Sequence, residues 1–193
     1  WKDYRKIFLT SDRIEQGVEF WRDNAEALIR AESTYGVGAE YIVAIIGIET
    51  RYGRHMGKYR VLDALVTLGF DYPPRAEFFR KELTQYLLMT REEGLDPKVQ
   101  LGSYAGAMGF GQFISSSFRA YAVDFNGDGR RDILSNKTDA IGSVANYFKR
   151  HGWRGDDQVI VPVALQDAAA DELANQGEAL RHTVGELRMR GIV

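Results

Sequence analysis

The segment YIVAIIGIETRYGRHMG, residues 41–57, is the strongest constraint on what this chain can form. The run from Ile42 to Ile48 carries no side chain that can hydrogen-bond, and Glu49 follows it directly. A run that is apolar on every side is typical of a buried helix, and it is too short for a membrane span, which needs roughly 20 residues. The sequence therefore predicts a carboxylate at the C-terminal end of a buried helix.

Glu49 in that position is a candidate general acid. Burial raises the pKa of a carboxyl group, and the negative end of a helix dipole raises it further. A carboxylic acid that stays protonated near neutral pH can give its proton to a leaving group. The alternative is that Glu49 turns to solvent, or pairs with Arg51 or Arg54.

Composition excludes several classes of function. The chain has 193 residues, a length that fits one domain, or one domain and part of another. Its net charge of −2 gives no basic excess, so nucleic acid is not expected as a partner. It has no cysteine, which excludes disulfides, thiol nucleophiles and zinc–thiolate sites. Aromatic residues make up 12% of the chain, which suits a groove that stacks sugars, although tyrosines more commonly fill cores.

Helical patterns dominate the rest of the chain, so we expect a mainly α fold with very little strand. A first helix should be capped by Ser11 or Asp12, with Glu15 in capping-box spacing, and end at Gly36. Its expected buried residues are Ile14, Val18, Trp21, Ala25, Leu28 and Ile29. Further helices are expected at about 61–68, 75–93, 114–123 and 139–151, with two short ones in 167–193, the second capped by Thr183 with Glu186. The one strand-like run is 159–163.

The segment GSYAGAMGFGQ, residues 102–112, has a high density of glycine. Glycine allows the backbone to approach a ligand or another segment closely. Both readings, ligand approach and close helix packing, stay open at this point.

The segment DFNGDGRRDILS, residues 124–135, follows the EF-hand pattern. Oxygen-bearing side chains fall at loop positions 1, 3, 5 and 9, with Gly129 at position 6, where the loop turns sharply. We expect one Ca²⁺, held by Asp124, Asn126, Asp128, the carbonyl of Arg130 and a closing carboxylate, with Asp132 acting directly or through water. Ser135 stands where a bidentate Glu is usual, so Asp139 is the predicted closing ligand of a longer loop. The alternative is a polar turn without metal.

Four segments together resemble one family. IIGIETRYGR, SYAGAMGFGQF, FRAYAVDFNGDG and DAIGSVANYFKRHGW are similar to the membrane-bound lytic transglycosylase B family, glycoside hydrolase family 103, and the resemblance covers essentially the whole chain. It implies a single lysozyme-like catalytic domain over 1–193, apparently truncated at its C-terminus. It also implies cleavage of the β-1,4 bond between N-acetylmuramic acid and N-acetylglucosamine in peptidoglycan, without water, leaving 1,6-anhydromuramoyl ends. The compartment implied is the periplasm, with or without an outer-membrane lipid anchor.

The resemblance also assigns roles to individual residues. Glu49 matches the catalytic acid/base. The substrate-binding positions are Tyr4, Arg75, Ser103, Gln112 and Tyr147. Pro74 and Phe78 depart from the expected pattern, which puts substrate contacts there in question. A usual glycosidase needs two carboxyl groups, about 5 Å apart if it retains configuration or roughly 6.5–9.5 Å if it inverts. Only Glu49 stands out here, and a transglycosylase needs only one.

Two other functions compete with this reading. A non-catalytic peptidoglycan-binding module would keep the groove without the reaction, and a hydrolytic muramidase would use water in place of the C6 hydroxyl. A calcium sensor is a third class, but it needs paired EF-hands and a Met-rich groove, and the chain has one such loop and four methionines.

Overall fold

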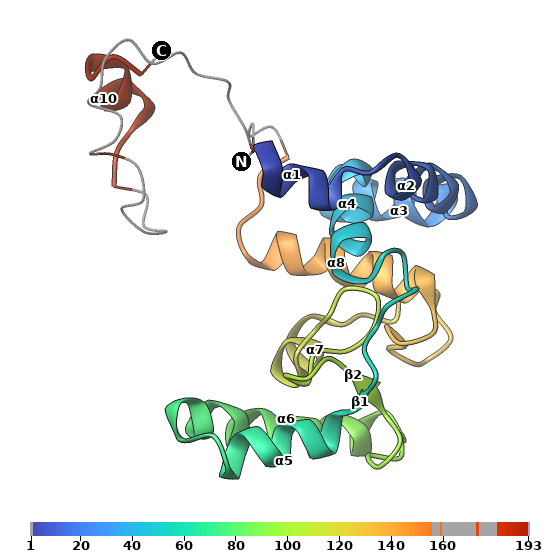
Figure 1. Ribbon diagram of the computed structural model, residues 1–193. Coiled ribbons are helices and arrows are strands. Elements are labelled where there is room, and N and C mark those ends of the chain that lie inside the picture. The colour runs from blue at the N-terminus through green and yellow to red at the C-terminus, as the bar shows by residue number, and fades with distance from the viewer. Residues whose placement is uncertain (1, 156–158, 160–172, 174–180, 193) are drawn as a thin grey trace. The chain divides into compact units, whose positions relative to one another are not determined.

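The computed structural model describes residues 2–155, 159, 173 and 181–192 (Figure 1). The chain divides into two compact units, Trp1–Gly155 and Asp156–Val193, and each is described by itself. The single domain expected over 1–193 stays a prediction. The strand-like run at 159–163 and the first helix expected after residue 167 lie largely outside the described residues.

Four helices open the first unit: α1 Lys2–Phe8, α2 Ser11–Asp23, α3 Ala25–Tyr35 and α4 Ala39–Thr50. Thr10, rather than Ser11 or Asp12, caps α2, because its hydroxyl accepts the Arg13 N–H at 3.3 Å. The single helix expected up to Gly36 is wrong. Asn24 divides it, and the Asn24 side-chain amide donates to the carbonyl of Phe20 at 2.7 Å. Gly36 ends α3 in a left-handed conformation, as expected.

A helical hairpin follows. Its elements are β1 Tyr59–Arg60, α5 Val61–Phe70, the 3₁₀ turn η1 Pro73–Arg75, α6 Ala76–Glu92 and β2 Leu101–Gly102. β1 and β2 pair antiparallel, with Tyr59 opposite Gly102, and α5 lies along α6 (Figure 1). The two prolines stand at the start of η1, where a missing backbone N–H does no harm.

The remaining described helices are α7 Ser115–Tyr121, α8 Lys137–Arg150 and, in the second unit, α10 Val184–Met189. α10 has the predicted capping box between Thr183 and Glu186. Within the part of the chain that the structure describes, no helix combines the length and apolar character needed to cross a bilayer.

The core is built around α4, which packs against α2, α3 and α8 (Figure 1). Ile42 and Ile46 of α4 are fully buried, together with Leu28 of α3 and Ile141 of α8. The prediction that α4 is buried on every side is nevertheless wrong, since Ile48 is 50% exposed. The buried face expected for α2 is also wrong, because Ile14, Val18 and Trp21 are exposed and Phe20 is buried instead.

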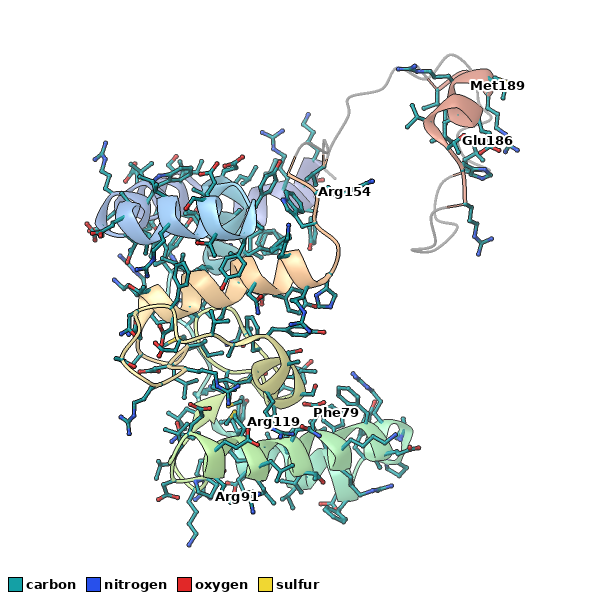
Figure 2. All side chains as sticks on the ribbon, turned by 180° about the vertical axis from the view of Figure 1, so that it is seen from behind. Phe79, Arg91, Arg119, Arg154, Glu186 and Met189 are labelled. Carbon is teal, nitrogen blue, oxygen red and sulfur yellow. The ribbon has the colours of Figure 1, made fainter. Side chains whose placement is uncertain are left out.

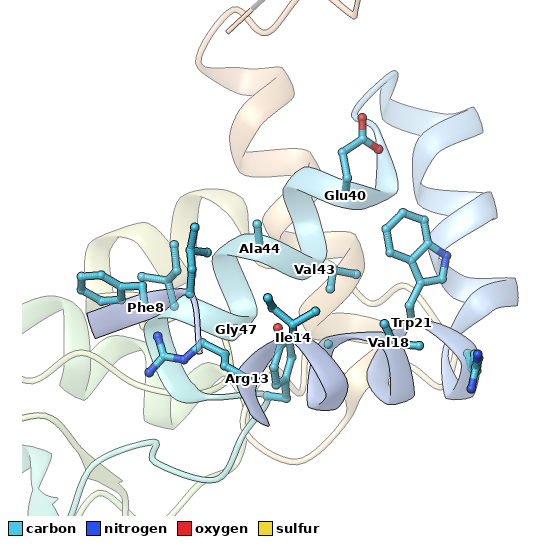
Figure 3. A pocket seen from close by; sticks show the side chains of 14 residues that line it. Phe8, Arg13, Ile14, Val18, Trp21, Glu40, Val43, Ala44 and Gly47 are labelled. Carbon is cyan, nitrogen blue, oxygen red and sulfur yellow. The ribbon is translucent and has the colours of Figure 1, made fainter. Parts of the chain in front are cut away.

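These exposed side chains line an apolar groove of about 470 Å³ between α1, α2 and α4. Figure 3 shows Phe8, Ile14, Val18 and Trp21 around it, with Val43 and Ala44 on the α4 side. Arg13 and Glu40 are charged residues in its lining, and Glu49 is not part of it.

Candidate functional site

Glu49 lies in the last turn of α4, just before the chain turns away. Arg51 and Tyr52 both have positive φ, 52° and 60°, which is uncommon for residues with a side chain. Their N–H groups bond back to the carbonyls of Gly47 at 3.1 Å and Ile46 at 3.2 Å, which closes the helix. The sharp turn leaves Glu49 at the edge of the helix bundle.

Glu49 opens onto a second cavity, of about 350 Å³. The other described residues lining it come from α4, the loop before α7, α7 and α8: Ile45, Gly111, Gln112, Phe113, Ile114, Ser117, Val144, Tyr147 and Phe148. Among these lining residues Glu49 is the sole carboxylate. The cavity therefore offers one acid/base group in largely apolar surroundings.

Burial by its neighbours raises the pKa of Glu49 above its usual range, in the direction expected from the sequence. Glu49 is nevertheless an exposed residue, as the alternative of a side chain turned to solvent predicts, so a ligand can reach it. Within the described residues, no hydrogen bond or ion pair engages its carboxylate. Arg51 pairs instead with Asp12 and Gln16, and Arg54 lies 3.9 Å from Glu19. The alternative in which Glu49 pairs with either arginine is not seen.

Gln112 lies in the lining of the same cavity, in a left-handed conformation with φ 49°. Its amide nitrogen donates to the carbonyls of Gly109 at 3.0 Å and Met56 at 3.3 Å. Both amide protons are thereby directed at the backbone, which leaves the amide oxygen as the group that can accept a bond from a ligand.

Ser103 has a different role from Gln112 in the structure. Its hydroxyl accepts the N–H groups of Ala105 at 3.3 Å and Ala107 at 3.0 Å, so it shapes the turn that follows β2. Ser103 is not among the residues that line the Glu49 cavity.

Tyr147 lines the cavity from α8 and is 38% exposed. Its ring meets Phe113 edge-on at 5.7 Å and stacks on His151 at 4.0 Å. Sequence reasoning missed His151, although its i,i+4 spacing from Tyr147 on one helix face could have indicated the stack.

Tyr4 and Arg75 lie outside this cavity lining. Tyr4 is exposed on α1, 5.1 Å from the ring of Phe8. The Arg75 guanidinium lies over the rings of Phe78, at 4.5 Å, and Phe79, at 5.1 Å. Cation–π contacts with Phe78 and Phe79 thus hold the Arg75 guanidinium in place.

The glycines around the site allow two loops to pack tightly. A side chain on Gly57, which has φ 101°, would overlap the carbonyl of Gly102, and one on Gly53 would overlap the ring of Phe110. These contacts join the loop after α4 to the loop before α7. Close packing therefore accounts for Gly102, while Gly111 lines the cavity itself.

The 124–135 loop turns around Asp124. The carboxylate of Asp124 accepts the N–H groups of Gly127 at 2.7 Å, Asp128 at 3.1 Å and Gly129 at 2.7 Å. Asn126 and Asp128 are exposed and bonded to each other at 2.8 Å. Two carboxylates, one amide and the Arg130 carbonyl are hard oxygen donors of the kind that Ca²⁺ prefers, so the donor set fits this ion. No group of three or more His, Asp or Glu side chains among the described residues forms a metal centre by itself.

Asp139 is fully buried and binds the loop backbone. Its two oxygens accept the N–H groups of Phe125 at 2.8 Å, Asn126 at 3.0 Å and Asp132 at 2.9 Å. A carboxylate offers about four lone-pair sites, so these bonds leave roughly one for a metal. Bidentate closure by Asp139 would require it to give up a backbone bond.

A network of ion pairs connects this loop to α6. Arg131 pairs with Glu93, and Arg119 of α7 pairs with Glu92 at 2.7 Å. Figure 2 shows Arg119 directed toward the α5–α6 hairpin. The loop, α7 and α6 are thereby held together next to the cavity wall that α7 supplies.

Comparison with known proteins gives consistent results. The chain matches the transglycosylase SLT domain over residues 1–193. It is 52% identical over 192 residues to membrane-bound lytic murein transglycosylase B of Escherichia coli (strain K12), covering 100% of this chain and 52% of that protein. The chain thus spans about half the length of this curated relative.

Solved structures agree with the fold. Soluble lytic transglycosylase SltB1 of Pseudomonas aeruginosa is 57% identical with a TM-score of 0.95, over 98% of this chain and 64% of that one. Escherichia coli Slt35 in complex with calcium is 50% identical with a TM-score of 0.91, over 100% and 60%. Pseudomonas aeruginosa SltB3, in complex with NAG-NAM-pentapeptide, is 35% identical with a TM-score of 0.89, over 98% and 50%. The expected mainly α, lysozyme-like class of fold is confirmed.

Proposed function

The chain belongs to the transglycosylase SLT domain family, and on that premise we propose that it is a peptidoglycan lytic transglycosylase. The reaction proposed is cleavage of the β-1,4 bond between N-acetylmuramic acid and N-acetylglucosamine, with formation of a 1,6-anhydro ring. The observation that carries the proposal is a lone carboxyl group of raised pKa that lines a cavity with no second carboxylate in its lining.

In the proposed mechanism, Glu49 acts first as acid and then as base. Its proton passes to the glycosidic oxygen, and the bond from that oxygen to C1 of the muramoyl sugar breaks. The C6 hydroxyl of the same sugar then attacks C1, and Glu49 takes the hydroxyl proton. Its raised pKa favours the protonated starting form. No water is consumed, so one carboxyl group serves both steps.

We assign substrate contacts in two groups. Gln112 and Tyr147 line the cavity with Glu49, so an amide oxygen and an aromatic ring are available beside the bond to be cleaved. Tyr4, Arg75 and Ser103 remain proposed contacts from the family resemblance, although they are not among the residues that line this cavity.

The test is digestion of purified sacculi, with Glu49→Gln as the matched variant. We expect the protein to release products with 1,6-anhydro ends, detected by mass spectrometry, and Glu49→Gln to lose at least about 10²-fold in rate. Reducing ends would support the hydrolytic muramidase instead. Binding to sacculi without any release at high protein concentration would support the non-catalytic module.

We also propose one structural Ca²⁺ in the 124–135 loop. The side chains of Asp124, Asn126 and Asp128 and the carbonyl of Arg130 would hold it, with Asp132 assisting. Asp139 would fix the shape of the loop and offer at most one further bond. The ion supplies loop rigidity, and no step of the reaction needs it. The proposed location is the periplasm, where peptidoglycan lies.

A further inference from the structure

We propose that Thr50 is a positioning residue for Glu49, an inference that rests on the proposed function. Thr50 is the last residue of α4, directly after Glu49, and is 1% exposed. Its hydroxyl joins the helix end to the loop that carries Gln112, so it sets how the two sides of the cavity face each other.

The Thr50 hydroxyl has three backbone partners. It lies 2.9 Å from the carbonyl oxygen of Phe110 and 3.1 Å from that of Ile46, and it accepts the N–H of Gly53 at 3.1 Å. The bond to Phe110 is the important one, because it joins segments 60 residues apart in the chain. The bond to Ile46 lies within the helix and could be made by any helical threonine.

The Phe110 bond falls two residues from Gln112, at the start of the cavity wall. Gly111, Gln112 and Phe113 all line the cavity with Glu49. Gln112 is bonded in turn to Met56, beyond the turn that follows α4. Thr50 and Gln112 therefore both join the end of α4 and the loop after it to the 109–113 segment, each with a side-chain bond to the backbone of the other segment. Thr50 makes its bond from the position next to Glu49.

Removal of this hydroxyl should affect the reaction more than the fold. A valine has the same shape but leaves the Phe110 carbonyl and the Gly53 N–H without their bond. The α4 end and the 110–113 segment can then separate slightly, which would shift the Glu49 carboxyl and let more water reach it. Small misplacements of a catalytic group reduce rate strongly, by as much as about 10²-fold for 1 Å.

The experiment compares Thr50→Val, Thr50→Ser and the control Thr90→Val. Thr90 is also buried, at 2% exposure, and its hydroxyl donates to Leu87 within α6 at 3.2 Å; Thr90 is not among the residues that line the cavity. We measure the rate of anhydro-product release at saturating sacculi, the apparent KM, the Tm, and the titration of the Glu49 carboxyl by ¹³C NMR.

We expect Thr50→Val to lower kcat about 10- to 100-fold with little change in KM, and to move the Glu49 titration toward its ordinary range. Thr50→Ser should recover most of this loss because it keeps the hydroxyl. Thr90→Val should lower Tm, by less than Thr50→Val because one bond is lost, and leave kcat and the titration unchanged. If Thr50→Val does not fold, Thr50→Ala takes its place against Thr50→Ser.

The proposal is overturned if Thr50→Val keeps both kcat and the Glu49 titration of the wild type, or if Thr50→Ser loses as much activity as Thr50→Val. Failure of the proposed function gives a different result. The wild type would then release no anhydro products, while the NMR titration would still report whether Thr50 controls the surroundings of Glu49.

Discussion

Tyr52 packs against α4 only because residue 47 is a glycine. A Cβ atom at Gly47 would lie 2.5 Å from the hydroxyl oxygen of Tyr52, and one at Gly17 on α2 would also lie 2.5 Å from it. The tyrosine therefore fills a space that two glycines leave between α2 and α4. Because Tyr52 lies in the turn that follows Glu49 and Thr50, this contact fixes the direction of the chain after the end of α4.

Gly47→Ala should consequently destabilise the protein by about 1–3 kcal/mol, the usual effect of overpacking. Urea unfolding measures it. Gly185→Ala in α10 is the control, because the nearest atom to a Cβ there is 3.9 Å away, so this change should be neutral or slightly stabilising. Equal stability of Gly47→Ala and the wild type would mean that Tyr52 does not need this space.

The raised pKa of Glu49 also predicts a dependence of stability on pH. A group with a raised folded-state pKa binds its proton more tightly when folded, so its stabilisation is fully present below the unfolded pKa. That stabilisation is lost as pH rises through the folded pKa. Glu49→Gln, which never ionises, should then be more stable than the wild type at neutral pH.

Thermal melts from pH 3 to pH 8 measure this difference between Glu49→Gln and the wild type. The difference should be smallest in acid and grow through the pH range in which Glu49 ionises. A constant offset at all pH values would contradict a raised pKa. Glu77→Gln is a useful control, since the Lys81 ammonium lowers the pKa of that exposed carboxyl and the dependence should have the opposite sign.

Two aspartates of the 124–135 loop should respond differently to Ca²⁺. Asp128 is exposed, and Asp128→Ala should remove the rise in Tm that Ca²⁺ produces while changing the melt in EDTA only slightly. Asp139→Ala should lower Tm even in EDTA, because it leaves three backbone N–H groups without their acceptor.

Differential scanning calorimetry in EDTA and in millimolar Ca²⁺ separates these effects. Mg²⁺ should raise Tm less than Ca²⁺, since it requires a tighter octahedral shell. A wild-type melt that is identical in EDTA and Ca²⁺ would rule out the metal. An Asp139→Ala melt in EDTA that equals the wild type would show that its backbone bonds contribute little.

Glu82 should stabilise the start of α7. It is 5% exposed on α6, and its carboxylate accepts the Ser116 N–H at 2.9 Å, whereas Ile114 at the N-cap position cannot do so. Glu82→Ala should cost about 1–3 kcal/mol, because the N–H loses a buried partner. Glu77→Ala on the same helix removes an exposed ion pair with Lys81, which solvent screens, and should cost less than Glu82→Ala. Chemical denaturation compares the two, and equal costs would contradict the capping role.

The position of Glu49 could be predicted because the signal is local: an apolar run, a carboxylate and a turn within one helix. The exposure of one face of α2 could not be predicted. The spacing of Ile14 and Val18 indicates an apolar face, but it does not say whether another element covers that face. The pairing of Tyr59 with Gly102 could not be predicted, because a strand of two residues is too short to show the alternation of apolar and polar residues that marks a strand. Asp139 was expected to bind a metal. The sequence does not show that its oxygens also accept three backbone N–H groups of the 124–135 loop. The Thr50–Phe110 bond likewise depends on partners far apart in the chain.

The absence of a charged partner for Glu49 among the described residues bears on the conditions in which this protein can work. Its pKa is raised by displaced water and not by a neighbouring charge. Dissolved ions weaken interactions between charges. Because no neighbouring charge contributes to the raised pKa of Glu49, added salt should change that pKa little. The proton on Glu49 should therefore be held almost equally well in dilute and in concentrated salt.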